Sequence, residues 1–521
     1  MRGETDRRVV RHRAPDGVAD ARTLGRRPHV VVVGGGIAGL CAATGLAERG
    51  VGVEVIERED RLGGRVGGWT EQRPDGSNVA MSRGFHAFFR QYYNLRALLR
   101  RADARLNCLT PLDDYPLVDG AGRWDTFRGL PRTPPWNALL FALRSPTFRF
   151  ADLLRLNPRA AAPLAAVSVP EIYRRLDHID VDTFLDRIRF PAAARHLALE
   201  VFSRSFFAPP AQLSAAELAT MFHIYFLGSS EGLVFDVPEA GFDRSLWSPL
   251  GKHLTALGVD FRLATTARSV ELAGSRRFRV LLDTGRGIDA DGVVLATDVA
   301  GLRRLLDASP GLAKAAEWAD SVRGLRNAPP FLVQRLWLDR PVAAHRPAFL
   351  AAGGLAPMDN VSVLNRYDRD ARDWAARHGG SVVELHAYSV PSNGSPERKH
   401  IDRLRRELVG RLHQLYPETR RAGVLEESVL WRADCPLFGV GDFARRPGVR
   451  TPHPGLVLAG DGIRIDVPAA LMERAATTGW HAANCLLARF GVRGHELRSV
   501  PTRGRLAPLR RLAELAREAE R

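Results

Sequence analysis

The chain has 521 residues, too many for one ordinary domain and enough for two or three. Apolar residues make up 45% and charged residues 26% of it, which excludes disorder or a disulfide-framework mini-protein as a description of the whole. The four cysteines are far apart and lack zinc or iron–sulfur spacing, so we expect a reducing compartment and no metal site.

The formal net charge of +17 invites a nucleic-acid partner, but its distribution argues against one. Residues 1–27 carry +4 and residues 487–521 carry +5, which leaves +8 for the rest of the chain. All but three of the 75 basic residues are arginine, as coding bias would produce. We therefore predict no nucleic-acid partner, a basic disordered tail over 1–27, and a second basic tail over 491–521 that can form an amphipathic helix. Both tails could contact an anionic membrane surface.

The first apolar stretch, residues 30–46, has the features of neither a secretory signal nor a membrane span. An arginine-rich segment precedes it, and its glycines favour a strand, a turn and a helix start. We expect a cytoplasmic protein, with peripheral association at the inner face of the cell membrane as an open alternative.

Hydrophobic periodicity predicts a βαβ unit, with a buried strand over 29–33, a helix over 37–49 and a strand over 53–57. Short amphipathic pieces interrupted by prolines follow between 133 and 169, and a helical pattern covers 185–230. The remaining expected elements are strands at 260–263, 279–282, 293–296 and 456–459, then a helix from about 469 to 490.

The strongest local signal is Gly34-Gly35-Gly36-Ile37-Ala38-Gly39, a G-x-G-x-x-G between the first strand and the first helix. Glycines there permit a tight turn and close approach of a pyrophosphate, which the positive end of the helix dipole stabilises. Glu57, at the end of the second strand, is placed to hydrogen-bond a ribose hydroxyl. The alternative is a glycine-rich turn such as any α/β protein can contain.

A second glycine–arginine element follows at Leu62-Gly63-Gly64-Arg65. Its arginine can form a fork onto a phosphate, while the glycines let the chain pass close to that phosphate. This extension favours a flavin protein over a plain nicotinamide dehydrogenase. The alternative treats Arg65 as one solvated arginine among many.

The third element lies near the end of the chain, where a predicted strand leads into Gly460-Asp461-Gly462. Asp461 is placed to bind a ribityl hydroxyl or a phosphate, and the helix that starts near Ala470 and Leu471 points its N-terminus at a flavin ring. That dipole would stabilise negative charge on the reduced flavin. A simple Asp-Gly turn between strand and helix is the alternative.

A fourth element combines Trp247-Ser248-Pro249-Leu250, a helix, and strands that end at 296–298. Together the four elements resemble the FAD-binding domain of the amine oxidase/phytoene desaturase superfamily. The resemblance implies an α/β fold, with a doubly wound Rossmann-type FAD-binding domain and an inserted α+β substrate domain. It assigns the discontinuous FAD-binding domain to residues 28–105, 240–310 and 450–490, and the substrate-binding domain to residues 106–239 and 311–449.

The same resemblance implies FAD as the cofactor and a set of residues that contact it. Beside the motifs above, it places the backbone around Val270 against the adenine and the segment with His86 beside the flavin. The implied contacts are Gly34, Gly36, Ile37, Ala38, Gly39, Glu57, Arg58, Gly64, Arg65, Gly84, Phe85, His86, Val270, Ala296, Gly460, Asp461, Ala470 and Leu471.

Longer strings are similar to carotenoid-modifying members, in particular isorenieratene synthases, the β-carotene desaturase/methyltransferases. They lie at 83–94, 222–228, 335–339, 358–362 and 380–388. This similarity implies a hydrophobic carotenoid substrate whose β-ionone ring is desaturated and aromatised with an intramolecular methyl shift. A linear carotene desaturase of the phytoene or ζ-carotene type and a redox-neutral FAD-dependent carotene isomerase are the alternatives. The electron acceptor stays unidentified.

Asp466 and Glu473 flank the helix that faces the flavin and are the candidate catalytic bases. His223 and His386 lie on apolar patterns and are expected to be core residues. The segment 135–141, followed by arginines, suits a membrane interface or a surface helix equally. Aromatic residues of the inserted region suit a substrate tunnel or an ordinary core, and they are Phe141, Phe148, Phe150, Phe206, Phe207, Phe226 and Phe235.

Overall fold

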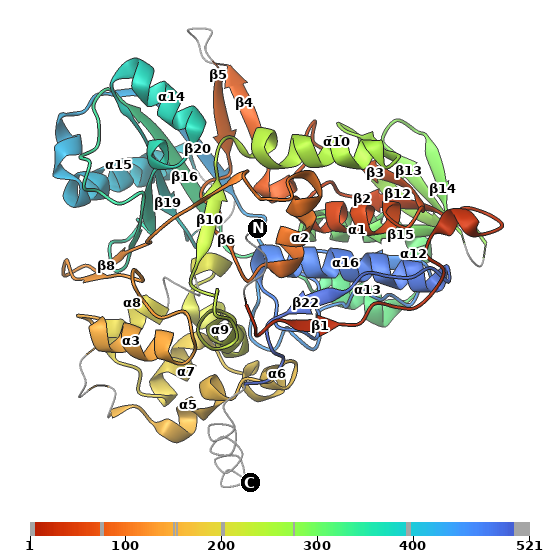
Figure 1. Cartoon of the computed structure of the whole chain (residues 1–521), viewed down its shortest axis with the longest axis horizontal. Coiled ribbons are helices and arrows are strands. Elements are labelled where there is room, and N and C mark those ends of the chain that lie inside the picture. Colours follow the sequence, from red (N-terminus) through yellow and green to blue (C-terminus); the bar gives the residue numbers. More distant parts are fainter. Residues whose placement is uncertain are drawn as a thin grey trace.

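The computed structural model describes residues 6–72, 78–148, 152, 155–198, 204–274, 277–391 and 397–504. Its first body, on the right in Figure 1, is built on a five-stranded parallel sheet with strand order β11-β3-β2-β15-β21. These strands are β2 (His29–Val33), β3 (Gly52–Ile56), β11 (Val259–Arg262), β15 (Gly292–Leu295) and β21 (Leu456–Leu458). Three distant segments of the chain thus build one sheet, and its order confirms the predicted Rossmann-type α/β arrangement.

Two helices from opposite ends of the chain, α1 (Ile37–Ala47) and α16 (Leu471–Arg489), lie side by side against this sheet (Figure 1). Their close approach needs glycine, because a Cβ on Gly45 would lie 2.8 Å from the Ala483 Cβ. A Cβ on Gly479 would lie 2.2 Å from the Ala38 carbonyl oxygen. Every residue of α1 is buried, as expected of an internal helix that is apolar all round.

Further elements complete this first body around the parallel sheet. An antiparallel sheet packs beside it and consists of β12 (Ala267–Leu272), β13 (Phe278–Leu282) and β14 (Gly287–Ala290). The accompanying helices are α2 (Tyr93–Ala102), α10 (Ser248–Ala256), α11 (Val299–Asp307), α12 (Pro310–Ala313) and α13 (Ala316–Arg323).

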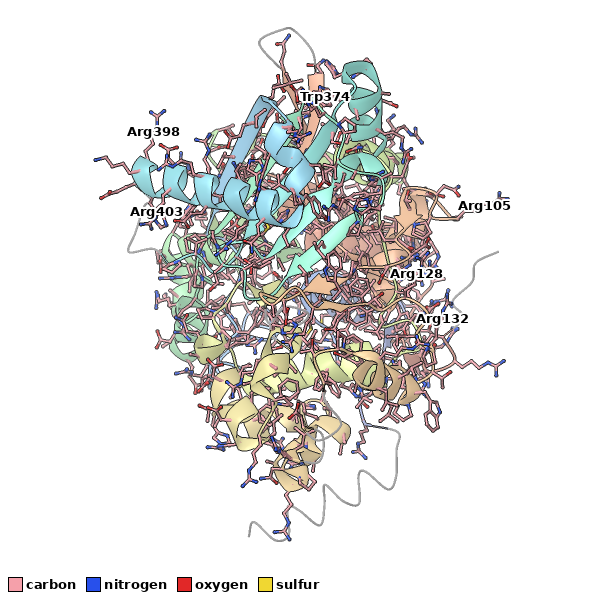
Figure 2. The ribbon with its side chains drawn as sticks, turned by 90° about the vertical axis from the view of Figure 1, so that its left-hand side faces the viewer. Arg105, Arg128, Arg132, Trp374, Arg398 and Arg403 are labelled. Atoms are coloured by element: carbon pink, nitrogen blue, oxygen red, sulfur yellow. The ribbon has the colours of Figure 1, made fainter. Side chains whose placement is uncertain are left out.

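The second body, at the upper left of Figure 1, is a seven-stranded mixed sheet in the order β20-β16-β19-β18-β17-β8-β9. Its strands are β8 (Leu117–Val118), β9 (Trp124–Asp125), β16 (Phe331–Leu338), β17 (Phe349–Ala352), β18 (Asn360–Val363), β19 (Ser381–Ala387) and β20 (Val424–Arg432). Helices α14 (Arg369–His378) and α15 (Arg398–Leu415) cover it. Leucines at every fourth position of α15 face the sheet, while Arg398 and Arg403 project outward (Figure 2).

The third body, at the lower left of Figure 1, is a group of short helices broken by prolines. They are α3 (Trp136–Arg144), α5 (Pro158–Ala165), α6 (Glu171–Leu176), α7 (Val181–Arg187), α8 (Arg195–Ala198) and α9 (Ala215–Phe222). Other short strands form two small sheets. One pairs β4 (Gly68–Gln72) with β5 (Asn78–Ser82), and the other has the order β6-β10-β7, with β6 (Phe88–Phe89), β7 (Leu109–Pro111) and β10 (Phe235–Pro238).

The prediction of a disordered tail over 1–27 is wrong for residues 6–27, and residues 491–504 are likewise not a free tail. Strand β1 (Val10–His12) pairs antiparallel with β22 (Leu497–Ser499), so the two chain ends are joined. Asp6 is buried and accepts hydrogen bonds from the hydroxyls of Tyr93 and Ser229, both at 2.7 Å. Arginine content predicted disorder, but paired backbone and a buried carboxylate order these segments. The predicted amphipathic helix falls mainly in 505–521, outside the described residues.

Candidate functional site

A cavity of about 1430 Å³ lies where the three bodies meet. Val33, Ile56 and Ala296 line it at the carboxyl ends of β2, β3 and β15. This edge is where doubly wound sheets bind their ligands. The cavity extends from there to the seven-stranded sheet, so one space joins the first body to the second.

The glycine motif shapes one end of the cavity. Gly34 has a φ of +112°, and a Cβ there would lie 2.4 Å from the Ala296 carbonyl oxygen, so only glycine fits this turn. Gly39 does not line the cavity, but a Cβ on it would lie 1.8 Å from the Gly34 carbonyl oxygen. At Gly36 the space is open, with nothing nearer to an added Cβ than the Gly64 Cα at 3.8 Å. A phosphate can therefore approach this backbone closely.

The N-terminus of α1 faces that open space. Ile37 and Ala38 line the cavity, and the helix has no side-chain cap at Gly36. The first amide groups of an α-helix have no partner within the helix, and the helix dipole adds a positive field there. The arrangement suits a bound anion such as a pyrophosphate.

Glu57 stands beside this helix end, as predicted, together with Arg58. Its carboxylate accepts hydrogen bonds from the amides of Gly35 at 2.6 Å and Glu59 at 2.8 Å. Burial raises the pKa of Glu57 although these two bonds oppose it. The two amides fix the orientation of the carboxylate at the end of β3, where it can accept a bond from a ribose hydroxyl.

Arg65 and Asp461, predicted as separate cofactor contacts, form an ion pair with each other on the cavity wall. Burial alone would lower the pKa of Arg65, but Asp461 and its acidic neighbours raise it far above the ordinary value. Gly64 and Gly460, which precede these two residues in the chain, also line the cavity. The pair joins the second and third predicted motifs, which lie almost four hundred residues apart.

The N-terminus of α16 forms another part of the wall. Leu471, Met472 and Ala475 line the cavity, and Ala470 caps the helix without a side-chain hydrogen bond. Leu471 has a φ of 53°, a left-handed conformation that turns the chain sharply into the helix. A second positive helix end thus faces the same space as α1.

The predicted bases, Asp466 and Glu473, are not supported by their positions, since neither lines the cavity. Glu473 is buried, and its carboxylate accepts bonds from the backbone amides of Asn94 at 2.8 Å and Leu95 at 3.0 Å. It therefore satisfies the N-terminus of α2. Asp466 is exposed to solvent. Spacing alone placed both near the helix end, but their side chains are directed elsewhere.

The prediction for Val270 also needs correction. Its side chain is fully buried, it does not line the cavity, and its amide donates to the Ser309 hydroxyl at 2.8 Å. Ala267 and Arg268, on the same strand β12, line the cavity instead. The part of β12 that faces the cavity is thus its N-terminal end, while the adenine contact itself stays a prediction.

The segment with Gly84, Phe85 and His86 crosses the middle of the cavity wall, where Phe85 and His86 are lining residues. Gly84 does not line the cavity, but it has a φ of +101° and a Cβ there would lie 2.5 Å from the His386 Cε1. The His86 Nδ1 donates to the Gly84 carbonyl oxygen at 2.9 Å, which leaves Nε2 as an acceptor. Burial lowers the pKa of His86 to about 4, so its ring is neutral at physiological pH.

The far end of the cavity is aromatic. Of the phenylalanines proposed for a tunnel, Phe206, Phe207 and Phe235 line it, whereas Phe141 and Phe226 belong to the core behind and Phe150 lies outside the described residues. Phe148 packs on Phe190 rather than facing the cavity. Phe89, Tyr92 and Tyr388, from the strings at 83–94 and 380–388, also line it. The aromatic lining residues that the sequence analysis did not name are Trp69, Tyr115, Phe331, Phe349 and Phe438.

Sequence reasoning also missed a polar group on this wall. His386 was expected in the core; it is buried, yet it lines the cavity together with Tyr388 and Asn360. His223, by contrast, is buried away from the cavity and contacts the Pro501 carbonyl oxygen at 2.7 Å, as a core histidine. The signal was present, since Glu384, His386 and Tyr388 alternate along one strand and so share a face. Among the described residues, no cluster of histidine, cysteine or carboxylate side chains could hold a metal ion.

Comparison with known proteins shows the family of the chain. A family model described as flavin containing amine oxidoreductase matches residues 37–487. The carotenoid phi-ring synthase of Streptomyces griseus is 56% identical, over 98% of this chain and 97% of its own length. A probable zeta-carotene desaturase of Synechococcus elongatus is 24% identical, over 88% of this chain and 98% of its own length.

A solved structure of putrescine oxidase bound to putrescine has the same fold, with a TM-score of 0.63 and 18% identity over 89% of this chain and 100% of that one. The open glycine turn, the two helix ends without a side-chain cap and the oriented Glu57 suit the pyrophosphate and ribose of a flavin dinucleotide. The chain belongs to the flavin containing amine oxidoreductase family and is an FAD-dependent oxidoreductase.

Proposed function

We propose that this protein desaturates and aromatises the β-ionone ring of β-carotene, with an intramolecular methyl shift. The observation that carries the proposal is the cavity, which joins the dinucleotide motifs at one end to an aromatic wall at the other. An apolar, conjugated substrate needs such a wall, because it offers few groups for hydrogen bonding. The 56% identity to a carotenoid phi-ring synthase over nearly the whole chain supports a carotenoid ring as the substrate.

The proposed conversion removes four hydrogens from each ring, which amounts to two two-electron oxidations. Bound FAD supplies the hydride acceptor for these oxidations, and another molecule must reoxidise it. The chain orients the ring between aromatic side chains such as Phe207 and Phe235 and excludes water from the cationic ring. The methyl group moves within the substrate, so no methyl donor is required.

The residues that line the cavity also support the assignment of FAD and the carotenoid to different segments of the chain. We propose that residues 28–105, 240–310 and 450–490 hold FAD, because they supply the glycine turns and both helix ends. Residues 106–239 and 311–449 would enclose the carotenoid, because they supply most of the aromatic wall. Phe85 and Phe89 belong to the first set by sequence but line the aromatic part, so the boundary of the carotenoid site runs through the first domain.

Production in a β-carotene-forming host, with mass spectrometry and NMR of the pigment, tests the proposed reaction. We expect a product that has lost four hydrogens for each ring converted and carries a shifted methyl group. Unchanged β-carotene in the presence of FAD-loaded enzyme would refute the proposal.

A linear carotene desaturase is the second candidate, because a probable zeta-carotene desaturase is similar over 88% of this chain. It would add double bonds to the polyene and leave both end rings intact, so the same NMR spectra separate the two. A redox-neutral isomerase would leave the molecular formula of the carotenoid unchanged.

We further propose that α3 contacts the membrane in which a carotenoid dissolves. Its outer face exposes Trp136, Leu139 and Leu143 at 61%, 50% and 66%, spaced as one stripe of a helix. Arg128 and Arg132, which precede α3 in the chain, are exposed and project outward (Figure 2). Cationic side chains near an apolar stripe suit contact with anionic lipid headgroups. Among the described residues no helix is both long and apolar enough to cross a bilayer. We propose, from the exposed stripe and the nearby arginines alone, a peripheral contact at the inner face of the cell membrane.

An aromatic path connects this helix to the cavity. Phe141, on the inner side of α3, stacks on Phe127 at 4.8 Å between ring centroids, and Phe127 stacks on Tyr115 at 4.3 Å. Tyr115 lines the cavity. A row of buried, stacked aromatic rings thus connects the helix that carries the exposed stripe to the proposed carotenoid site.

Sedimentation with anionic vesicles tests the membrane contact. The triple variant W136S/L139S/L143S should lose most of its vesicle binding and keep its FAD. The matched control is V424S/L425S, which removes two exposed apolar side chains of β20 instead. Equal binding of both variants would exclude α3 as the contact.

A further inference from the structure

A buried polar row runs along one face of β19. Side chains alternate in a strand, so Glu384, His386 and, just after the strand, Tyr388 share one face. His386 and Tyr388 line the cavity, and Glu384 lies behind them. The residues between them, Val383, Leu385 and Ala387, belong to the apolar core beneath α15. A chain of hydrogen bonds joins the row, with 2.8 Å from Glu384 Oε1 to His386 Nε2 and 2.8 Å from His386 Nδ1 to the Tyr388 hydroxyl.

The inner end of the row is held as a charged group. Arg335 lies opposite Glu384 on β16 and donates two hydrogen bonds to Glu384 Oε2, at 2.9 and 2.6 Å. Burial would raise the pKa of Glu384, but Arg335 and His386 outweigh it and hold this pKa at about 2. Arg335 is itself fixed by the Ala80 carbonyl oxygen and the Ser82 hydroxyl. The carboxylate is therefore ionised and immobile.

The charge on Glu384 decides the direction of every hydrogen bond in the row. An ionised carboxylate only accepts, so His386 Nε2 must donate to it. With the proton on Nε2, the imidazole has its acceptor at Nδ1, and the Tyr388 hydroxyl donates to that atom. Asn360 Nδ2 donates to the Tyr388 oxygen at 3.0 Å, which leaves that oxygen one further lone pair.

The outer end of the row lies between the two halves of the cavity. Tyr388 packs edge-on against Phe207 of the aromatic wall, with 4.7 Å between ring centroids. The Cys435 thiol lies within electrostatic reach of Tyr388 on one side and of the Arg65–Asp461 pair on the other. The hydroxyl thus stands where a ring bound against the aromatic wall would meet the cofactor end.

We propose that Tyr388, His386 and Glu384 form a proton relay that takes up the proton lost by the carotenoid ring, an inference that rests on the proposed function. After hydride loss the ring is a cation. A C–H bond next to the cationic carbon breaks, and its electron pair becomes the new ring double bond. The proton bonds to the Tyr388 oxygen while the phenol proton passes to His386 Nδ1. The positive charge then rests on an imidazolium beside the Glu384 carboxylate.

After the product leaves, the imidazolium and the phenol return this proton to water along the same path. Tyr388 is the residue that touches the substrate, whereas His386 and Glu384 act through it. In this role the row replaces Asp466 and Glu473, neither of which lines the cavity.

The test compares kcat and KM of Tyr388→Phe, His386→Gln and the double variant in reconstituted vesicles that contain β-carotene. Tyr367→Phe is the matched control, because this buried tyrosine also lies within electrostatic reach of Glu384 but does not line the cavity. General acid–base groups contribute roughly 10²–10⁴-fold to rate. We expect Tyr388→Phe to lower kcat at least about 100-fold with unchanged KM and FAD content, and the control to keep wild-type kcat.

The double variant should be no slower than the slower single variant, since residues that act as one unit are not additive. A kcat for Tyr388→Phe within about threefold of wild type, or additive losses in the double variant, would overturn the relay alone. Wild-type protein that holds FAD and leaves β-carotene unchanged would overturn the proposed function as well. Each variant is compared at equal FAD content, so that a lower kcat cannot be due to loss of the cofactor.

Discussion

Replacement of Glu217 by glutamine is the sharpest test of what holds the first and third bodies together. Glu217 lies on α9, is fully buried, and accepts a hydrogen bond from each of two buried arginines, Arg446 and Arg474, both at 2.7 Å. Arg474 belongs to the first turn of α16, and both guanidinium groups lie over the ring of Phe438, which lines the cavity. Glutamine keeps the shape of the side chain but removes the only formal charge on it.

The expected loss of stability follows from burial. Burial alone would raise the pKa of Glu217, but the two arginines hold it below its ordinary value, so the carboxylate is ionised at neutral pH. Removing one partner of a buried ion pair typically costs about 3–5 kcal/mol, because the charge left behind is unpaired in a medium of low dielectric. For a folding unit of 150–250 residues this lowers the thermal midpoint by roughly 6–20 °C.

Thermal unfolding of the FAD-loaded protein, followed by flavin and tryptophan fluorescence, measures this loss. The matched control is Glu171→Gln, since Glu171 forms an exposed pair with Arg174 at 2.8 Å on the same body. Exposed pairs contribute about 0–1 kcal/mol, so the control should shift the midpoint little. Equal midpoints for wild type and Glu217→Gln would refute the reasoning and show that the arginines find other partners.

Three further predictions concern the cofactor, the chain end and pH. Gly36→Val should abolish FAD retention, because the valine side chain fills the open turn. The control Gly410→Val, at a glycine of α15 with equally open surroundings, should retain FAD. Flavin absorbance retained in purified Gly36→Val would contradict the prediction. Deletion of residues 1–12 should lower the unfolding midpoint, because it removes β1 and the buried Asp6; an unchanged midpoint would mean that the end is dispensable. The pKa of His86 is about 4 in the folded protein and about 6.5 in the unfolded chain. As the pH falls from 6.5 to 4, the unfolded chain therefore binds a proton that the folded protein does not, and the free energy of unfolding falls by about 3 kcal/mol. His86→Gln should flatten that part of the pH profile.

The dinucleotide end of the site could be predicted because its chemistry is local. A turn that needs a positive φ at Gly34 and no side chain at Gly36 requires glycine whatever the rest of the chain does. The buried strand and helix on either side show in the hydrophobic pattern. Glu57 follows from the same unit, since it ends the neighbouring strand. These features need no knowledge of distant contacts.

The failures share a physical cause, which is that spacing along a helix or strand does not show where a side chain points. Glu473 begins a helix that faces the cavity, yet its carboxylate turns to the amides of α2, almost four hundred residues earlier in the chain. Val270 lies on strand β12, and its side chain is on the buried face of that strand. Residues 6–27 have the composition of a tail, and only the pairing of β1 with β22 shows otherwise. Each outcome depends on a partner remote in sequence.

The relay on β19 lies between these cases. The alternation of Glu384, His386 and Tyr388 with apolar residues is a local pattern, and it requires two different environments on the two faces of the strand. This alternating pattern does not show which face of the strand packs in the core and which lines the cavity, because an apolar face can pack against either a helix or a hydrocarbon substrate. Helix α15 settles the question by covering Val383 and Leu385 with its leucines, which leaves the polar face to the cavity. A buried, ionised carboxylate on that face is expensive to maintain, and its fixed partner Arg335 stabilises it where packing alone would favour an apolar residue. A buried carboxylate held by a fixed arginine is expected where a charge serves chemistry rather than stability. The relay is therefore a better candidate for the proton acceptor than Asp466, which is exposed, or Glu473, which caps α2.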